Sequence, residues 1–414
     1  MHDTQHEVQP ERCILAAVDL GEYDIEASLD ELAELARTAG AEVVGRISQK
    51  RTELHAATCM GEGRLEELAV LCKNSDVDLV IFDHELSAGQ LREIEQALDV
   101  RVVDRTQLIL DIFAARAVTA EGKLQVELAQ QRYRLPRLAG MGTALSRLGG
   151  GIGTRGPGET KLESDRRHVR RRIATLEAQL QELSRRRKNL ADKRRDDGVL
   201  TVAITGYTNS GKSTLLNRLS GAGVLAADML FATLDPTSRG VELPDGRTVI
   251  FIDTVGFISR LPHQLVEAFK STLEVAVYAD LVLAVGDITS PTLDEQQRVT
   301  KELLGELGVE PGRILTVLNK CDHLSIAVGE SDSQTVLISA LTGQGIGELL
   351  GRIARALPVT SRRMKLLLPF SQGALLAEIR ARGKVFSEEF TEDGILTDAL
   401  VDQRLWRQAA PFAI

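Results

Sequence analysis

Cysteines are scarce in this 414-residue sequence, and long apolar runs are absent. Its four cysteines lie far apart with no CxxC spacing, which argues against a zinc site or a disulfide framework and favours a reducing compartment. The longest apolar runs, such as Leu79–Phe82 and Leu281–Val285, fall far short of the roughly 18–20 residues that span a bilayer. The N-terminus has no basic segment followed by an apolar stretch, so we expect no secretory signal. These features predict a cytoplasmic protein without a membrane span, and they leave peripheral membrane association open.

The acidic charge is unevenly distributed along the chain. The formal net charge is −9, yet residues 164–197 hold twelve lysines and arginines against six aspartates and glutamates. A basic segment in an otherwise acidic protein points to a polyanionic partner better than the total charge does. Solvated helix faces are the plainer explanation for some of these arginines.

The first 105 residues alternate short apolar runs with stretches of helical spacing. Such alternation is typical of a parallel sheet covered by helices, so we expect a small α/β domain here. The expected strands are Ile14–Leu20, Glu42–Ile47, Leu79–Asp83 and Arg101–Val103. The expected helices are Leu29–Thr38, Leu65–Cys72 and Leu91–Leu98.

Two leucine-rich stretches follow, separated by a glycine-rich segment. The second repeats apolar residues at steps of four and three from Val169 to Leu183, until Arg187 interrupts the pattern. This spacing indicates two helical arms that pack as a hairpin. The segment 149–161 holds six glycines and a proline, which should not continue a helix. It is either a plain linker or, with Arg166–Arg172 beside it, a surface that contacts phosphates.

A phosphate-binding loop follows the apolar strand Val199–Thr205. Residues 206–213 read GYTNSGKS and match GxxxxGK[ST] between a strand and a helix. Glycines let backbone N–H groups face phosphates without interference from a Cβ, and the helix N-terminus adds positive charge. Lys212 would bridge the β- and γ-phosphates, and the Ser213 hydroxyl would bind Mg²⁺.

Four further segments occur in the order that a GTPase requires. Thr233, within Phe231–Thr237, would sense Mg²⁺ and the γ-phosphate, and Asp253–Gly256 forms a DxxG motif. Asp253 would hold Mg²⁺ through water, and the Gly256 N–H would meet the γ-phosphate. In Asn319–Asp322, the aspartate can accept two hydrogen bonds from guanine, and Ser339–Leu341 would offer an N–H to its O6. Together the five segments predict a GTP-binding domain.

The residue after the DxxG motif is Phe257, where signalling GTPases place a water-orienting glutamine. An apolar side chain cannot orient water, so we expect slow intrinsic hydrolysis that an external surface accelerates. Asn209 is either a ligand for K⁺ lying against the phosphates or a hydrogen-bonding residue of the loop. The sequence leaves both interpretations open. Catalytic roles are expected for Asn209, Lys212, Thr233 and Gly256.

The predicted fold class is α/β. It consists of a GTPase domain with a mostly parallel sheet, preceded by a small α/β domain and a helical hairpin arm and followed by a small α+β domain. The expected boundaries are 1–115 for the first domain, 116–197 for the arm, 198–358 for the GTPase domain and 359–414 for the last. The last domain should contain a strand at Lys365–Leu368, a helix at Ala374–Arg382 and a hairpin around residues 392–394.

The chain resembles the HflX GTPases over essentially its whole length. The most specific element is GIGTRGPGETKLE at residues 151–163, and the motifs GYTNSGKS, LFATLDPT, DTVGF and NKCD agree with it. The resemblance implies Mg²⁺ ligands at Ser213 and Thr233. It implies nucleotide contacts at Gly206, Tyr207, Thr208, Asn209, Ser210, Gly211, Lys212, Ser213, Phe231, Ala232, Thr233, Leu234, Asp235, Asp253, Thr254, Val255, Gly256, Asn319, Lys320, Cys321, Asp322, Ser339, Ala340 and Leu341.

The resemblance also implies a partner, the 50S ribosomal subunit, with rRNA contacted through the basic arm and the glycine-rich loop. Members of the family split or rescue stalled and idle ribosomes under stress, and we expect this chain to do so as a monomer. Family N-terminal domains are reported to engage adenine nucleotides, but residues 1–105 contain no phosphate loop. The alternative is a regulatory protein whose GTP state recruits a protein partner such as a protease complex.

Overall fold

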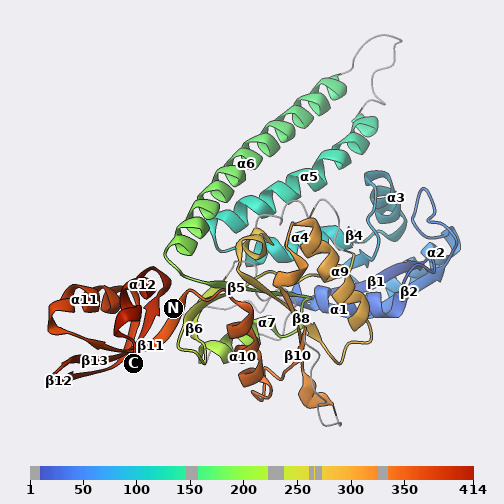
Figure 1. The fold of residues 1–414 in the computed structure, drawn as a ribbon. Helices are drawn as coiled ribbons and strands as arrows, with labels where there is room; N and C mark the ends of the chain where they lie inside the picture. Colours follow the sequence, from blue (N-terminus) through green and yellow to red (C-terminus); the bar gives the residue numbers. More distant parts are fainter. Residues whose placement is uncertain (1–9, 146–156, 222–236, 261–264, 266–272, 325–333) are drawn as a thin grey trace, which may run out of the picture. The chain divides into compact units, whose positions relative to one another are not determined.

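A computed structural model of the chain describes residues 10–145, 157–221, 237–260, 265, 273–324 and 334–414. The chain divides into two compact units. Unit 1 comprises Met1–Ser184, Ala227–Asp235 and Ile258–Ser271, and unit 2 comprises the remainder. The described residues form three sheets, one in unit 1 and two in unit 2 (Figure 1). The mixed α/β class predicted from the sequence is confirmed.

Unit 1 contains a four-stranded parallel sheet with the order β2-β1-β3-β4. Its strands are β1 (Glu11–Asp19), β2 (Ala41–Lys50), β3 (Leu79–Phe82) and β4 (Arg101–Asp104). The helices between and after them are α1 (Ile25–Thr38), α2 (Glu62–Ser75), α3 (Ala88–Leu98) and α4 (Arg105–Arg116). All four residues of β3 are buried, as expected for a parallel sheet with both faces covered. The strand order reverses between β1 and β3.

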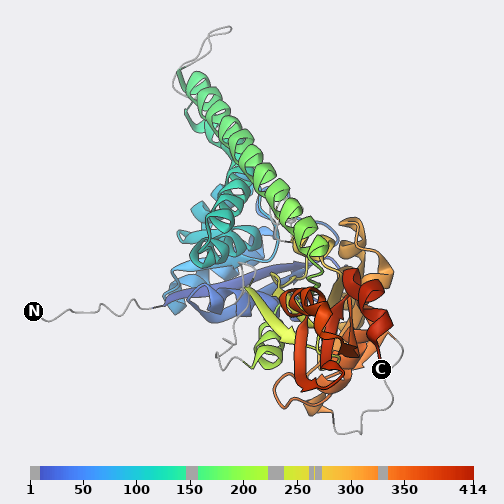
Figure 2. The same ribbon diagram turned by 60° about the vertical axis from the view of Figure 1, so that its left-hand side comes forward.

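Two long helices follow the sheet, α5 (Ala120–Leu145) and α6 (Pro157–Asp196), and α6 continues from unit 1 into unit 2. The predicted apolar seam holds them together: Leu128, Leu176 and Leu180 are buried in one cluster. Beside this cluster the Arg172 guanidinium donates two hydrogen bonds of 2.6 Å to the Glu127 carboxylate. The two helices lie side by side in both views (Figures 1 and 2).

The prediction for the glycine-rich segment is partly wrong. Residues 146–156 lie outside the described residues, but α6 begins at Pro157, so its last part is helical. A proline is tolerated in the first helical turn, because its missing N–H would have no partner within the helix. Further along α6, Arg187 interrupts the apolar pattern without ending the helix, and it pairs with Glu274 at 3.3 Å.

The larger sheet of unit 2 has six strands in the order β10-β9-β8-β5-β7-β6, with only β6 antiparallel to its neighbour. The strands are β5 (Thr201–Gly206), β6 (Thr237–Glu242), β7 (Thr248–Asp253), β8 (Leu281–Asp287), β9 (Ile314–Asn319) and β10 (Thr335–Leu337). The helices are α7 (Lys212–Ser220), α9 (Leu293–Glu306) and α10 (Ile346–Ala356). The hydrophobic core between this sheet and its helices consists of aliphatic side chains and Phe251. The carboxyl ends of β5, β7 and β9 meet at one edge, where parallel sheets bind ligands.

The smaller sheet of unit 2 is antiparallel, in the order β11-β13-β12. It comprises β11 (Ser361–Leu368), β12 (Lys384–Thr391) and β13 (Gly394–Asp402). Helices α11 (Gly373–Arg382) and α12 (Trp406–Ala409) accompany it, and Figure 2 shows this part in red. The predicted strand, helix and hairpin are all present. Among the described residues, no helix is both long and apolar enough to cross a membrane.

Candidate functional site

The GYTNSGKS loop joins β5 to α7 with a backbone that only particular residues permit. Gly206 has a φ of +141°, and a Cβ there would stand 2.0 Å from the Val285 carbonyl oxygen. Gly211 has a φ of +88°, and its Cβ would stand 2.2 Å from the Asn319 amide nitrogen. Both glycines are therefore required by space as well as by conformation. Asn209 is exposed and also has a positive φ, of 59°, which asparagine tolerates better than most residues.

Lys212 opens α7, and its ammonium group is buried within the loop. The Nζ atom donates a 2.6 Å hydrogen bond to the Tyr207 carbonyl. Burial lowers the pKa of Lys212 from 10.5 to about 8, although the charge of Asp253 acts in the opposite direction. An amine in this position can neutralise a phosphate that enters the loop.

Asp253 ends β7 beside the first turn of α7. The Ser213 hydroxyl donates a 2.7 Å hydrogen bond to its Oδ2 atom, so the hydroxyl expected to bind Mg²⁺ and the carboxylate expected to hold it through water lie together. Asp253 is only 1% exposed, and Thr254, also buried, donates its hydroxyl to the Ile204 carbonyl. The DxxG strand end is thus fixed to β5.

Gly256 and Phe257 are pressed against the phosphate loop. The Phe257 N–H donates to the Gly206 carbonyl at 3.0 Å, and its carbonyl accepts from the Thr208 N–H at 2.7 Å. The Phe257 ring is buried beside Tyr207 at a centroid distance of 6.4 Å. A Cβ on Gly256 would stand 2.8 Å from Thr208 Cγ2 and 2.9 Å from Lys212 Nζ. The Phe257 side chain therefore packs directly on the loop as a hydrophobic anchor.

The segment expected to recognise guanine lies at the end of β9. Asn319 is buried, donates to the Ser210 carbonyl at 2.9 Å and accepts from the Ala340 N–H at 2.9 Å. Asp322 is exposed, and a hydrogen bond from the Ser339 side chain is the main cause that lowers its pKa. The exposed carboxylate is therefore ionised and can accept hydrogen bonds from a base. Lys320 pairs with Asp287 at 2.6 Å.

The structure brings most of the sequence-predicted residues to one edge of the six-stranded sheet. Residues 206–213, 253–256, 319–322 and 339–341 are all described and contact one another through the bonds above. The predicted first switch, Phe231, Ala232, Thr233, Leu234 and Asp235, lies outside the described residues.

Sequence reasoning missed two features. It expected Asn319 at the nucleotide but did not predict that the side chain also links the phosphate loop to residues 339–341. It also missed Arg218, whose guanidinium donates to the Ala340 carbonyl at 3.0 Å and to the Leu341 carbonyl. Neither feature has a sequence signal, because the Asn319–Ser210 and Arg218–Ala340 bonds join residues more than a hundred positions apart that share no spacing rule.

A glycine-rich loop between a parallel strand and a helix, a DxxG strand end and a guanine-directed aspartate define a P-loop GTPase. Comparison with known families agrees. Residues 26–114 match a family described as GTP-binding GTPase N-terminal, residues 116–194 one described as GTP-binding GTPase Middle Region, and residues 201–320 one described as 50S ribosome-binding GTPase.

Curated relatives identify the family. The GTPase HflX of Caldanaerobacter subterraneus subsp. tengcongensis is 50% identical over 98% of this chain and 94% of its own length. The GTPase HflX of Lacrimispora saccharolytica is 48% identical over 97% of this chain and 96% of its own length. The GTPase HflX of Escherichia coli is 41% identical over 88% of this chain and 87% of its own length. The chain belongs to the HflX GTPase family, as its sequence resemblance predicted, and it is a GTP hydrolase.

Proposed function

We propose that this GTPase binds GTP with Mg²⁺ and acts in the cytoplasm on the 50S ribosomal subunit, splitting or rescuing stalled or idle ribosomes under stress. The observation that carries the ribosomal part is a set of exposed arginines on α6. Support also comes from the description of the family matched by residues 201–320, which names 50S ribosome binding.

Three arginines on α6 form this surface. Arg167, Arg170 and Arg171 are exposed and, among the residues that the structure describes, form no ion pair. Their spacing of three and four puts them on one face of the helix. Arg172 differs from them, because its guanidinium is engaged by Glu127 within the hairpin. The three arginines are therefore available to phosphates, whereas Arg172 stabilises the arm that carries them.

The phosphate site suits Mg²⁺. Its donors are the Ser213 hydroxyl and the Asp253 carboxylate, and Mg²⁺ prefers oxygen ligands of this kind. Ser213 would hold the ion directly with Thr233, and Asp253 would hold it through water. The ion would neutralise the charge that develops on the phosphates, while Lys212 and the Gly256 N–H orient the γ-phosphate.

We extend the proposal to K⁺ at Asn209. In the described part of the chain, the Asn209 side chain makes no hydrogen bond, and the residue is exposed at the tip of the loop. This favours the ligand interpretation over the loop hydrogen bond. Asn209 would then hold a cation against the phosphates in place of an arginine finger.

Binding of purified 50S subunits tests the ribosomal part. The variant R167E/R170E/R171E is compared with K188E/K193E/R194E, whose three exposed residues lie on the same helix and give the same change of charge. We expect weaker binding only for the first variant. The slope of log K against log salt should fall in magnitude by about 2–3, since each phosphate contact contributes roughly 0.7–0.9.

Equal binding by the wild type and both variants would contradict the assignment of the arginine surface. Equal loss in both would indicate a general charge effect rather than a site. If the wild type binds no 50S subunit at any salt concentration, the regulatory alternative, in which the GTP state recruits a protein partner, replaces the proposal.

A further inference from the structure

The loop that follows β10, residues 339–344, is folded by its own backbone. The Ser339 N–H donates to the Gln344 carbonyl at 3.0 Å, and the Gly343 N–H donates to the Ser339 carbonyl at 2.8 Å. The Thr342 N–H donates to the Ser339 hydroxyl at 3.1 Å. These bonds fix both ends of the loop, and all of its residues belong to unit 2.

One amide of this loop is left for a ligand. The Ala340 N–H donates to the Asn319 side chain at 2.9 Å, and the Gln344 N–H donates to the Thr342 hydroxyl at 3.4 Å. Within the part of the chain that the structure describes, the Leu341 N–H is the only amide of residues 339–344 that donates to no protein group. Leu341 is also 70% exposed, so a ligand can reach it.

Arg218 holds the peptide group that carries this amide. It lies in α7, the helix that begins at Lys212, and its Nε atom donates to the Ala340 carbonyl at 3.0 Å. Its Nη2 atom donates to the Leu341 carbonyl. The Ala340 carbonyl and the Leu341 N–H belong to one trans peptide group, so they point in opposite directions. Because Arg218 turns the carbonyl toward α7, the Leu341 N–H is turned away from α7.

The guanidinium of Arg218 suits this task. Its planar fork presents several N–H donors in a fixed geometry, so one side chain can bind two carbonyls and restrict the rotation of the peptide between them. Among the described residues, Arg218 forms no ion pair, and α7 belongs to unit 2 together with the loop. The phosphate-binding helix and the base-binding loop are thus joined by two hydrogen bonds from one arginine.

The neighbouring Asp322 defines the edge of the base that this amide would meet. The Ser339 side chain donates a hydrogen bond to Asp322, which lowers the pKa of that exposed carboxyl. We expect the carboxylate to accept from guanine N1 and the 2-amino group, and O6 is the next atom along the same edge. O6 is an acceptor, whereas adenine carries an amino donor at this position. An N–H fixed opposite O6 therefore favours guanine and disfavours adenine.

We propose that Arg218 is a positioning residue for guanine selection: by holding the Ala340 and Leu341 carbonyls on the side of α7, it directs the Leu341 N–H to guanine O6. Without the guanidinium the peptide group is free to rotate, and rotation replaces a donor opposite O6 by a carbonyl that repels it. This inference goes beyond the proposed function. It rests on guanine-nucleotide binding by unit 2 and not on the ribosome.

The test measures Kd on the full-length protein for GDP and for two analogues that each differ from it at one position of the base. In 6-thio-GDP a sulfur, which is a weaker acceptor, replaces O6, and the N1–H and the 2-amino group remain. IDP lacks the 2-amino group and keeps O6. We expect R218M to reduce the preference for GDP over 6-thio-GDP by about 2–10-fold, which corresponds to one net hydrogen bond. The preference for GDP over IDP, which reports on Asp322, should stay within about twofold of the wild type.

Two further variants sharpen the comparison. R218K keeps the charge but lacks the fork, so its preference for GDP over 6-thio-GDP should lie between those of R218M and the wild type. The matched control is R355M, because Arg355 is an exposed arginine of α10 that donates to the Gly351 carbonyl of its own helix at 3.3 Å. R355M should leave both preferences unchanged.

Three results would overturn the proposal. Equal binding of GDP and 6-thio-GDP by the wild type would show that no donor reads O6. A preference for GDP over 6-thio-GDP that R218M leaves within about twofold of the wild type, even with a lowered melting temperature, would show that Arg218 is merely structural. A parallel loss of both preferences would indicate general disorder of the base site. R218K decides the question if R218M fails to fold.

Discussion

Substitution of Asn319 by alanine should separate support of the nucleotide site from direct contact with the nucleotide. Its amide connects the Ser210 carbonyl of the phosphate loop to the Ala340 N–H of the guanine-directed loop, both at 2.9 Å. Asn319 is 3% exposed, so water cannot replace these bonds without a rearrangement. Asn319→Ala leaves two buried polar groups without their partner.

The expected losses of stability and of nucleotide affinity follow from those two buried groups. Each unsatisfied buried group costs about 1–3 kcal/mol, so the free energy of unfolding should fall by about 2–6 kcal/mol. The net strength of the two bonds, about 0.5–1.5 kcal/mol each, sets the free energy of nucleotide binding that is lost. This loss of binding free energy corresponds to a loss of affinity of about 5–150-fold. Since we expect both loops to contact GTP and GDP alike, the two nucleotides should be affected equally.

Fluorescence titration with labelled GDP and a labelled GTP analogue measures both affinities, and chemical denaturation measures the stability. Gln344→Ala is the control, because it removes an exposed amide from the neighbouring loop and should change affinity less than twofold. An Asn319→Ala protein with wild-type affinity would refute the reasoning. A loss confined to one nucleotide would mean that Asn319 does not act through the connection of the two loops.

Further outcomes are expected for substitutions or titration at three other residues. Leu176 is fully buried in the seam, so Leu176→Ala should destabilise the helical arm by about 2–5 kcal/mol. Faster hydrogen exchange in α5 and α6 would show this loss. Leu190→Ala, at a 54% exposed position of α6, should have little effect. The affinity for GTP should decrease as pH rises through about 8, where Lys212 loses its proton, and Lys212→Met should remove this dependence from binding curves. Because the pKa of Lys212 is lower in the folded chain than its usual 10.5, this residue should also make the folded state more stable as pH rises from about 8 to 10.5, which thermal melts can check. Asn209→Ala should hydrolyse GTP at the same rate in K⁺ and Na⁺ buffers while the wild type is faster in K⁺; a preference kept by the variant would exclude a potassium ligand at Asn209.

Local patterns predicted much of this fold. Apolar periodicity indicated the parallel sheet of unit 1 and the seam around Leu176, since both depend on neighbours within a few turns or strands. Motif spacing placed the phosphate loop between a strand and a helix and Asp253 at the end of a strand, as the structure has them. The domain boundaries stay predictions.

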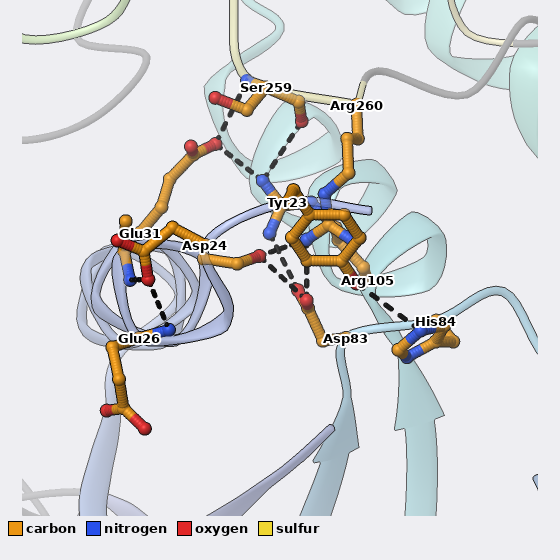
Figure 3. A network of polar contacts seen from close by, with 11 residues as sticks. Tyr23, Asp24, Glu26, Glu31, Asp83, His84, Arg105, Ser259 and Arg260 are labelled. Atoms are coloured by element: carbon orange, nitrogen blue, oxygen red, sulfur yellow. Dashed lines mark hydrogen bonds and ion pairs between the residues drawn. The ribbon is translucent and has the colours of Figure 1, made fainter. Parts of the chain in front are cut away.

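The contacts that sequence reasoning missed are long-range and polar. Arg260 and Asp83, which form an ion pair within unit 1 (Figure 3), are 177 positions apart, and neither lies in a repeat or motif that would indicate its partner. Pro157 illustrates the opposite error: a residue that usually ends helices begins one, because only the interior of a helix needs its missing N–H. A composition argument alone cannot make that distinction.

Hydrolysis of GTP, measured with and without purified 50S subunits, is the first test of whether the ribosome is this protein's partner. We predict slow turnover by the protein alone, strong stimulation by 50S subunits, and loss of that stimulation in R167E/R170E/R171E but not in K188E/K193E/R194E. Lys212→Ala should abolish turnover in both conditions. Turnover that 50S subunits leave unchanged, in K⁺ as well as in Na⁺ buffer, would contradict the claim that the ribosome is the partner.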